Sequence, residues 1–281
     1  MVLKADFLGF TEPTKEALQL ARKLVILVPF ANFVFTLSTT FYLIFIAEAV
    51  GGGNYILGLA IVGPLIVIQM VIQTLLDYPS GALGDWIGHR YVIFIGNVCF
   101  GFQFIFVSFI TSQTPFLFLV FVYALGGIGA SQISGAWGAW FDNNYRVAMP
   151  NDTEKKQYGA FWGRFGMLGE ISSTVALIPG SILAAAYGRP WVFFVEGLAA
   201  FFFAFLVLIL LTDLPQVKEK REKPSVDQYL SLLKDGVRYM WKNQFIRFMI
   251  LGGMLLTSTI AVWGNLILFP IYFSYLLTDT A

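Results

Sequence analysis

The sequence predicts an all-α membrane protein, a polytopic bundle of helices that cross the lipid bilayer. Of its 281 residues, 57% are apolar even when Gly is left out, and only 12% are charged. A soluble protein of this length could not bury so much apolar surface, so lipid must surround most of the chain. The apolar residues also fall in runs of about 20, which is the length that a membrane helix needs.

Seven apolar runs meet this requirement of length. They divide the chain into a polar N-terminal segment (1–22), a six-helix domain (23–212), a central loop (213–247) and the region of a seventh helix (248–281). The predicted helices cover residues 24–47, 55–76, 91–110, 115–141, 161–187, 191–212 and 248–277.

The basic residues predict the orientation, because Lys and Arg concentrate in the cytoplasmic loops of membrane proteins. With the N-terminus in the cytoplasm, Arg189 is the one residue of 18 Lys and Arg that falls outside. We therefore expect a multi-pass protein of the plasma or inner membrane with a cytoplasmic N-terminus. The first apolar run is too long for a cleaved signal peptide, so we expect it to stay in the protein.

The central loop contains an expected amphipathic helix. Apolar residues recur at helical spacing from Val226 to Met240, and Lys234, Arg238 and Lys242 form a basic row. This pattern predicts a helix on the inner leaflet. A linker helix without a regulatory role is the alternative, and we favour it, since amphipathicity alone says nothing about regulation.

The fourth predicted helix carries two rows of small residues at a spacing of four. Small residues let membrane helices approach closely, so we expect this helix to touch two neighbours. The rows are Gly126, Ala130, Ser134 and Gly138, and Gly127, Ser131, Gly135 and Ala139.

Ionisable residues at membrane depth cost about 2.5–3.5 kcal/mol each on insertion scales, so they need a reason. Glu170 lies about half-way along the fifth predicted helix, where desolvation favours the binding of a proton. Its alternative role is that of a structural partner for a basic group. Arg164 precedes it by six residues, about 240° around one helix, so the two cannot pair directly. Glu196 lies nearer the outer end of the sixth helix, where we expect an interfacial structural role.

Uncharged polar residues form stripes on several predicted helices. Such stripes line a water-filled cavity or hydrogen-bond between helices, and the second role is the commoner one. Together with the ionisable residues they give the candidate substrate and proton cavity: Asn32, Thr36, Gln69, Gln132, Arg164 and Glu170.

Several functions have no support in the sequence. It contains no P-loop, no HExxH and no GxSxG motif, and its one Cys and one His exclude a cluster of such ligands. We therefore expect no enzyme activity, no metal site and no cofactor. The net charge of +1 gives no reason to expect a nucleic-acid partner.

A glycine-rich stretch, GALGDWIGHR at 81–90, lies between the second and third predicted helices, where we expect a tight turn. It resembles the signature loop of the major facilitator superfamily, whose pattern is roughly Gly-x-Leu-Ala/Gly-Asp-Arg-x-Gly-Arg-Arg/Lys on the cytoplasmic side. The stretch from Ser134 to Asp142 is similar to fourth-helix sequences of the family's prokaryotic members.

The resemblance implies a secondary transporter that moves a small molecule by alternating access. Its six-helix domain would consist of inverted three-helix repeats. Since such transporters usually have twelve helices, the chain would be truncated after its seventh. We expect the lipid bilayer, a small-molecule substrate, protons, and a missing C-terminal half or second subunit as partners. An efflux permease is one form that such a transporter takes, and the sequence leaves the direction of transport open. The alternative is a non-transporting receptor derived from a transporter, or a half-transporter subunit that needs a partner.

The resemblance also implies roles for single residues. Gly81, Gly84 and Gly88 would allow the turn, and Asp85 would hold an inner gate closed against the N-terminus of a helix in the other half. His89 or Arg90 would bridge to Asp142. Two departures count against drug–proton antiport: Trp86 replaces the Arg of the signature, and Tyr123 stands where such antiporters carry an Arg.

Overall fold

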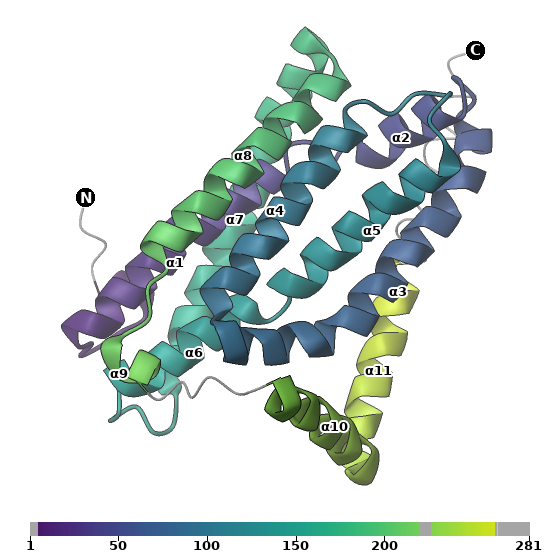
Figure 1. Ribbon diagram of the computed structural model, residues 1–281. Coiled ribbons are helices and arrows are strands. Elements are labelled where there is room, and N and C mark those ends of the chain that lie inside the picture. Colours follow the sequence, from purple (N-terminus) through teal and green to yellow (C-terminus); the bar gives the residue numbers. More distant parts are fainter. Residues whose placement is uncertain (1–4, 220–225, 262, 264–281) are drawn as a thin grey trace. The chain divides into compact units, whose positions relative to one another are not determined.

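The computed structural model describes residues 5–219, 226–261 and 263 (Figure 1). These residues form helices and contain no strand. The chain divides into two units, residues 1–223 and 224–281. The first unit contains η1 (Asp6–Leu8), α1 (Lys15–Phe35), α2 (Tyr42–Val50), α3 (Tyr55–Ile87), α4 (His89–Val107), α5 (Phe116–Ile133), α6 (Ala136–Ala148), α7 (Lys156–Tyr187), α8 (Arg189–Leu210) and α9 (Pro215–Glu219). The second contains α10 (Val226–Lys242) and α11 (Gln244–Ala261).

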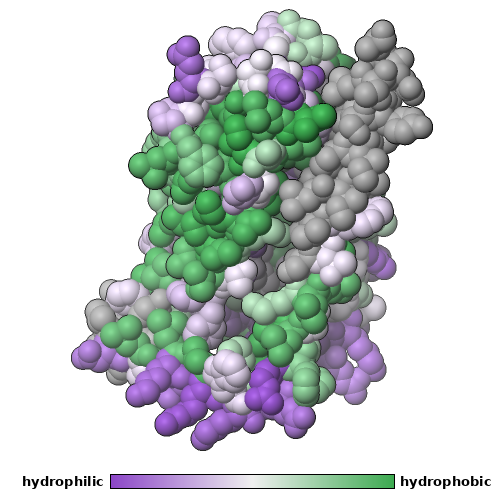
Figure 2. Space-filling model, turned by 90° about the vertical axis from the view of Figure 1, so that its right-hand side faces the viewer, coloured by the Kyte–Doolittle hydropathy of each residue, from purple (hydrophilic) through white to green (hydrophobic). Residues whose placement is uncertain are grey.

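Six stretches of the described residues are long and apolar enough to cross a membrane, which confirms the predicted polytopic helix bundle. Figure 2 shows apolar side chains over much of the visible surface, with hydrophilic ones towards both of its ends. The predicted seventh helix starts within α11, but its residues 262 and 264–277 lie outside the described part of the chain. The six stretches are Lys15–Phe35, Tyr55–Ile87, His89–Val107, Phe116–Ala148, Lys156–Tyr187 and Arg189–Leu210.

Two predicted helices are broken in the structure. The first was expected to be continuous, but α1 ends at Phe35 and α2 begins at Tyr42. Hydroxyl groups at this break compete for backbone hydrogen bonds, since Thr36 Oγ1 donates to the Asn32 carbonyl at 2.6 Å. The fourth breaks between α5 and α6, where Gly135 has a φ of 72°. Positive φ values suit Gly, which has no Cβ.

The second predicted helix is longer than expected. Helix α3 continues to Ile87, so most of the stretch predicted as a turn is helical. The chain turns at Gly88 alone, which has a φ of 107° and donates its N–H to the Gly84 carbonyl at 2.9 Å. We call the end of the bundle that carries Gly88 and residues 149–155 the motif end. The expectation of a turn failed because the glycines of the motif suit a closely packed helix as well as a loop.

A second helix pair repeats this geometry at the opposite end of the bundle (Figure 1). There α7 ends, Gly188 takes a φ of 90°, and α8 begins at once. The Gly188 N–H donates to the Ala184 carbonyl at 2.9 Å. The packing has the same symmetry, because α3 packs on α5 as α7 packs on α1, and α4 packs on α8. This arrangement agrees with the predicted inverted three-helix repeats.

Glycines bring the helices of the bundle into close contact. A Cβ on Gly127 of α5 would lie 2.6 Å from the Gln69 carbonyl of α3, and one on Gly129 would lie 3.1 Å from the Gly96 carbonyl of α4. Helix α5 therefore touches two neighbours, as its rows of small residues predicted. A Cβ on Gly197 of α8 would lie 2.8 Å from the Gly101 carbonyl of α4.

The second unit contains the amphipathic helix expected from the sequence, as α10. Among its apolar side chains, Leu230, Val237 and Trp241 are exposed, whereas Leu233 and Met240 are partly buried. Asn243 follows α10 and caps α11 by accepting the Ile246 N–H on its Oδ1 at 3.3 Å. The location of α10 on the inner leaflet stays a prediction.

We expect Gly127→Ala to destabilise the protein by about 1–3 kcal/mol, because the added methyl group would press against the α3 backbone. Gly138→Ala is the matched control, since a Cβ there meets no atom within 4 Å. This control should be neutral or stabilising by about 0.5–1 kcal/mol, the usual gain of Ala over Gly in a helix. Thermal unfolding of both purified variants in one detergent measures the difference. Equal effects would contradict the tight contact between α3 and α5.

Candidate functional site: the motif end and the polar groups of the bundle

The motif at 81–90 forms the junction of α3 and α4. Gly84 is required there because a Cβ would overlap Nδ1 of His89. The His89 ring is only 4% exposed, and it packs against the last turn of α3 after the chain reverses at Gly88. Gly81 differs, since a Cβ at that residue would meet no atom within 4 Å. The motif therefore places an imidazole ring against a helix.

His89 links three helices at the motif end. Its Nε2 lies 3.3 Å from Oδ1 of Asp85 on α3 and 3.3 Å from Nδ2 of Asn143 on α6. With the ring proton on Nε2, His89 donates to the Asp85 carboxylate, and Asn143 Nδ2 then lies beside this nitrogen without donating to it, because a protonated ring nitrogen cannot accept a hydrogen bond. The Asp85 side chain remains 69% exposed, so its carboxylate can accept further hydrogen bonds.

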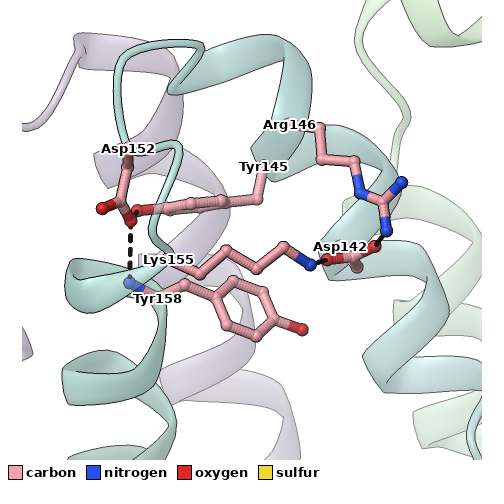
Figure 3. Close-up of polar contacts among 6 residues, drawn as sticks. All are labelled: Asp142, Tyr145, Arg146, Asp152, Lys155 and Tyr158. Atoms are coloured by element: carbon pink, nitrogen blue, oxygen red, sulfur yellow. Dashed lines mark hydrogen bonds and ion pairs between the residues drawn. The ribbon is translucent and has the colours of Figure 1, made fainter.

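The expected bridge from His89 or Arg90 to Asp142 is wrong. Arg90 instead lies over the ring of its neighbour Tyr91, with 4.5 Å from Cζ to the ring centroid. Asp142 is occupied by two other cations, Arg146 Nη2 at 2.6 Å and Lys155 Nζ at 2.6 Å (Figure 3). Arg146 lies one turn later on α6, and Lys155 directly precedes α7, so these two neighbouring cations occupy Asp142.

Lys155 has an unusual backbone conformation. Its φ of 53° is the only positive value among the described residues other than Gly. Its side chain extends over the Tyr158 ring, with Nζ 5.0 Å from the ring centroid, before it reaches Asp142 (Figure 3). These contacts offset a left-handed conformation that costs an L-residue about 1–2 kcal/mol.

Asp152 caps the start of α7. Its Oδ2 accepts the Tyr145 hydroxyl at 2.7 Å and the Tyr158 N–H at 3.1 Å, and its Oδ1 accepts the Gln157 N–H at 3.4 Å (Figure 3). Partial burial acts to raise the pKa of this carboxyl, but these hydrogen bonds outweigh it and hold the pKa below its ordinary value. The connection between α6 and α7 is therefore tied to both helices.

The start of the chain packs onto the same connection. Phe10 stacks on Tyr145 and Phe161, with centroid distances of 6.2 and 5.6 Å. Thr14 Oγ1 caps α1 by accepting the Ala17 N–H at 3.1 Å and donates to the Ala148 carbonyl at 2.8 Å. The motif end is thus one packed assembly of η1, α1, α6 and α7.

The candidate cavity residues separate into two groups. Glu170 is exposed and has no partner among the described residues, and the Asn32 amide lies next to its neighbour, since Nδ2 is 2.9 Å from a Cβ placed on Gly169. Arg164 lies apart from them, because its guanidinium binds the Asp6 carbonyl of η1. The structure therefore brings Asn32 towards Glu170 but not Arg164.

The remaining candidates are engaged within the bundle. Thr36 uses its hydroxyl on its own helix. Gln69 is half-buried on α3, and its backbone carbonyl faces Gly127. Gln132 is buried, and its Nε2 lies 3.4 Å from Ser131 Oγ. Its Oε1 has no partner among the described residues.

Sequence reasoning missed a buried polar cluster formed by Glu196, Ser38, Tyr42, Gln103 and Tyr123. We expected water to be close to Glu196, and this expectation is wrong, because Glu196 is 0% exposed. Its Oε1 accepts the Ser38 N–H at 2.8 Å, within the break between α1 and α2. Gln103 Nε2 donates to Tyr42 Oη at 3.3 Å. These five polar residues lie in four apolar runs, and only packing shows that they meet.

A bundle of six membrane-spanning helices with inverted packing and a helix–glycine–helix motif at one end defines a class of polytopic transport proteins. The family model of the Major Facilitator Superfamily matches residues 24–279 of the chain. The chain therefore belongs to this superfamily of membrane transporters. No curated protein and no solved structure matches it.

We expect Gly84→Ala to lower the thermal stability of the protein, because the methyl group would collide with the His89 ring. Removing that ring in Gly84→Ala/His89→Ala should recover part of the loss, with a coupling energy of about 0.5–3 kcal/mol. Unfolding in detergent of the two single variants and the double variant completes the cycle. Gly81→Ala is the control, and additive losses at Gly84 and His89 would contradict the contact.

We expect Asp152→Asn to cost about 0.5–1 kcal/mol at neutral pH, at the low end for a hydrogen-bonded carboxylate because the group is partly solvated. Since folding lowers the pKa of Asp152, its contribution is complete above the unfolded value, about 3.9, and is lost as the pH falls through the folded value. The gap in melting temperature between wild type and variant should close below about pH 4. Glu154→Gln, on an exposed residue of the same connection, is the control. A gap that stays constant with pH would exclude the charge as its cause.

Proposed function

We propose that the chain forms part of a secondary active transporter that moves a small molecule by alternating access, coupled to protons through Glu170. The N-terminus and the motif end would face the cytoplasm across a plasma or inner membrane. The single observation that supports proton coupling is the position of Glu170 as an exposed carboxyl without a partner among the described residues.

Glu170 occupies the middle of its helix. It lies 14 residues after Lys156 and 17 before Tyr187, the two ends of α7. At 1.5 Å of rise per residue, each end is more than about 20 Å away. An exposed carboxyl at that depth is too costly in hydrocarbon, so it must face water or another part of a protein. Substrate and ion sites of this superfamily's architecture lie at the same depth.

The surroundings of Glu170 suit a proton and a polar solute. Asn32 of α1 supplies an amide beside Gly169, and Thr174 lies one turn further along the exposed side of α7. The Thr174 hydroxyl donates to the Glu170 backbone carbonyl at 2.9 Å, which leaves the carboxyl itself uncommitted. No Lys or Arg forms an ion pair with it among the described residues, so a proton is the cation that can neutralise it there.

The motif end would act as the inner gate. Asp85 accepts from His89 and is otherwise open, so it can meet the positive end of a helix dipole in a second bundle. That second bundle would come from a C-terminal half or from a second subunit. The ion pairs of Asp142 would keep the cytoplasmic ends of α6 and α7 together during alternating access.

A non-transporting receptor or partner subunit derived from a transporter is the second candidate. The helix junction at Gly88 and the exposed Asp85 would then serve assembly instead of gating. Flux into sealed vesicles separates the two, because a receptor binds small molecules without moving them. Comparison of inside-out with right-side-out vesicles tests whether the direction of transport is efflux.

For the proton-coupled transporter we expect Glu170→Gln to abolish the pH dependence of transport. The experiment uses the full-length protein in liposomes with an imposed pH gradient and a pH-sensitive dye inside. A panel of sugars, peptides and organic cations is added, and the wild type should release protons with one of them while the variant should not.

Glu16→Gln, an exposed carboxyl at the start of α1, is the matched control and should keep the dye response. Unchanged proton movement in Glu170→Gln would refute the proton role. Binding of a panel member without flux in the wild type would instead favour the receptor.

A further inference from the structure

The buried cluster around Glu196 has no place in the transport cycle proposed above. Glu196 lies on the second turn of α8, about 10 Å along the helix axis from Arg189. Arg189 is committed elsewhere, since its Nη1 binds Glu48 Oε2 of α2 at 2.5 Å. Glu196 itself is fully buried, yet only Oε1 has a hydrogen bond, from the Ser38 N–H. Oε2 is buried without a partner among the described residues.

An ionised carboxylate does not fit this environment. Burial of a charge without a counter-charge costs several kcal/mol, and a buried oxygen without a donor adds to that cost. A neutral carboxylic acid fits better, because its carbonyl oxygen can accept the Ser38 N–H and an unpaired buried hydroxyl costs much less than an unpaired buried charge. The observed geometry therefore corresponds to Glu196 with its carboxyl group protonated.

The groups that surround Glu196 supply no countercharge. Helices α1, α4 and α7 pack against α8, and several of their cations are engaged elsewhere: Lys23 Nζ donates to Thr212 at 2.8 Å, Arg90 lies over Tyr91, Lys156 pairs with Glu154, and Arg164 binds the Asp6 carbonyl. The titratable groups near the carboxyl are Tyr42 of α2 and, beside Tyr42, Tyr123 of α5. Helix α4 contributes the neutral amide of Gln103.

Aromatic rings close the site against water. Phe193 lies one turn before Glu196 on α8 and contacts Phe41, Tyr42 and Phe45, with centroid distances of 5.7, 5.7 and 5.0 Å. Phe41 belongs to the break between α1 and α2, and Tyr42 and Phe45 belong to α2. Water can therefore reach Glu196 only if the break and its aromatic cover move.

We propose that Glu196 is a proton-binding site in which the neutral acid holds the break between α1 and α2 closed through the Ser38 N–H. Loss of the proton leaves a carboxylate that must be hydrated, so the break opens and water enters. The proton passes to that water, one for each opening. This site is separate from Glu170 and does not depend on a transport role for that residue.

The experiment reads protonation and opening on the full-length protein in lipid. Infrared difference spectra follow the carbonyl band of a protonated carboxyl as the pH rises, and hydrogen exchange follows the backbone amides of residues 36–41. In the wild type, the band should disappear and the protection of these amides should fall, corrected for the intrinsic effect of pH on exchange. Because one proton leaves on opening, protection should fall by up to about tenfold per pH unit.

Glu196→Gln should remove the band and keep residues 36–41 protected at every pH, because the neutral amide oxygen still accepts the Ser38 N–H. Glu196→Asp, which keeps a titrating group, should shift the pH of both changes and serves if the Gln variant does not fold. Glu170→Gln should retain the band, so a failure of the Glu170 proposal stays separate from a failure here. A Glu196 band that is absent at every pH, or protection that does not follow the band, would overturn the proposal.

Discussion

In hydrocarbon every backbone N–H and C=O must find a partner within the protein, and this constraint governs how the bundle can depart from straight helices. In the described part of the chain the helices are interrupted at few points, and backbone N–H groups at these points have hydrogen-bond acceptors. The Gly88 and Gly188 N–H groups turn back to carbonyls of the helix just ended. At the break between α1 and α2, the Ser38 N–H reaches across to Glu196 on another helix. At that break, therefore, the hydrogen bonding of the backbone depends on an ionisable side chain of another helix.

At the motif end, hydrogen bonds between side chains occur together with close packing of the helices. Gly84 admits the His89 ring, the ring holds Asp85, and Asn143 brings α6 to the same nitrogen. A second cluster, around Asp142 and Asp152, fixes α6 to α7. The first cluster fastens α3 to α4 and the second fastens α6 to α7, so each helix junction at this end has its own polar contacts. Asp85 alone is largely open to a further contact.

Much of the fold follows from the sequence, because apolar runs of membrane length are long and unambiguous signals. The breaks do not, since Thr36–Phe41 and Ser134–Gly135 lie inside runs whose mean hydropathy is high. In the candidate site, the sequence predicted the positions of some residues but not of others. Gly84, Asp85 and His89 of the motif lie together, but Arg146 and Lys155 take the place of the expected cation on Asp142. The burial of Glu196 was not predicted, since depth along a helix does not reveal which side neighbouring helices cover.

The continuity of α3 through the motif has a mechanical consequence. A helix of 33 residues is about 50 Å long, well beyond the roughly 30 Å of hydrocarbon that it crosses. Figure 1 shows that α3 bends before its junction with α4, and Pro79, which lies inside the helix and has no N–H to donate, precedes that junction. Asp85 lies six residues after Pro79, on the segment next to the junction. A movement at this bend would displace Asp85 relative to the rest of the bundle and so make or break a single polar contact.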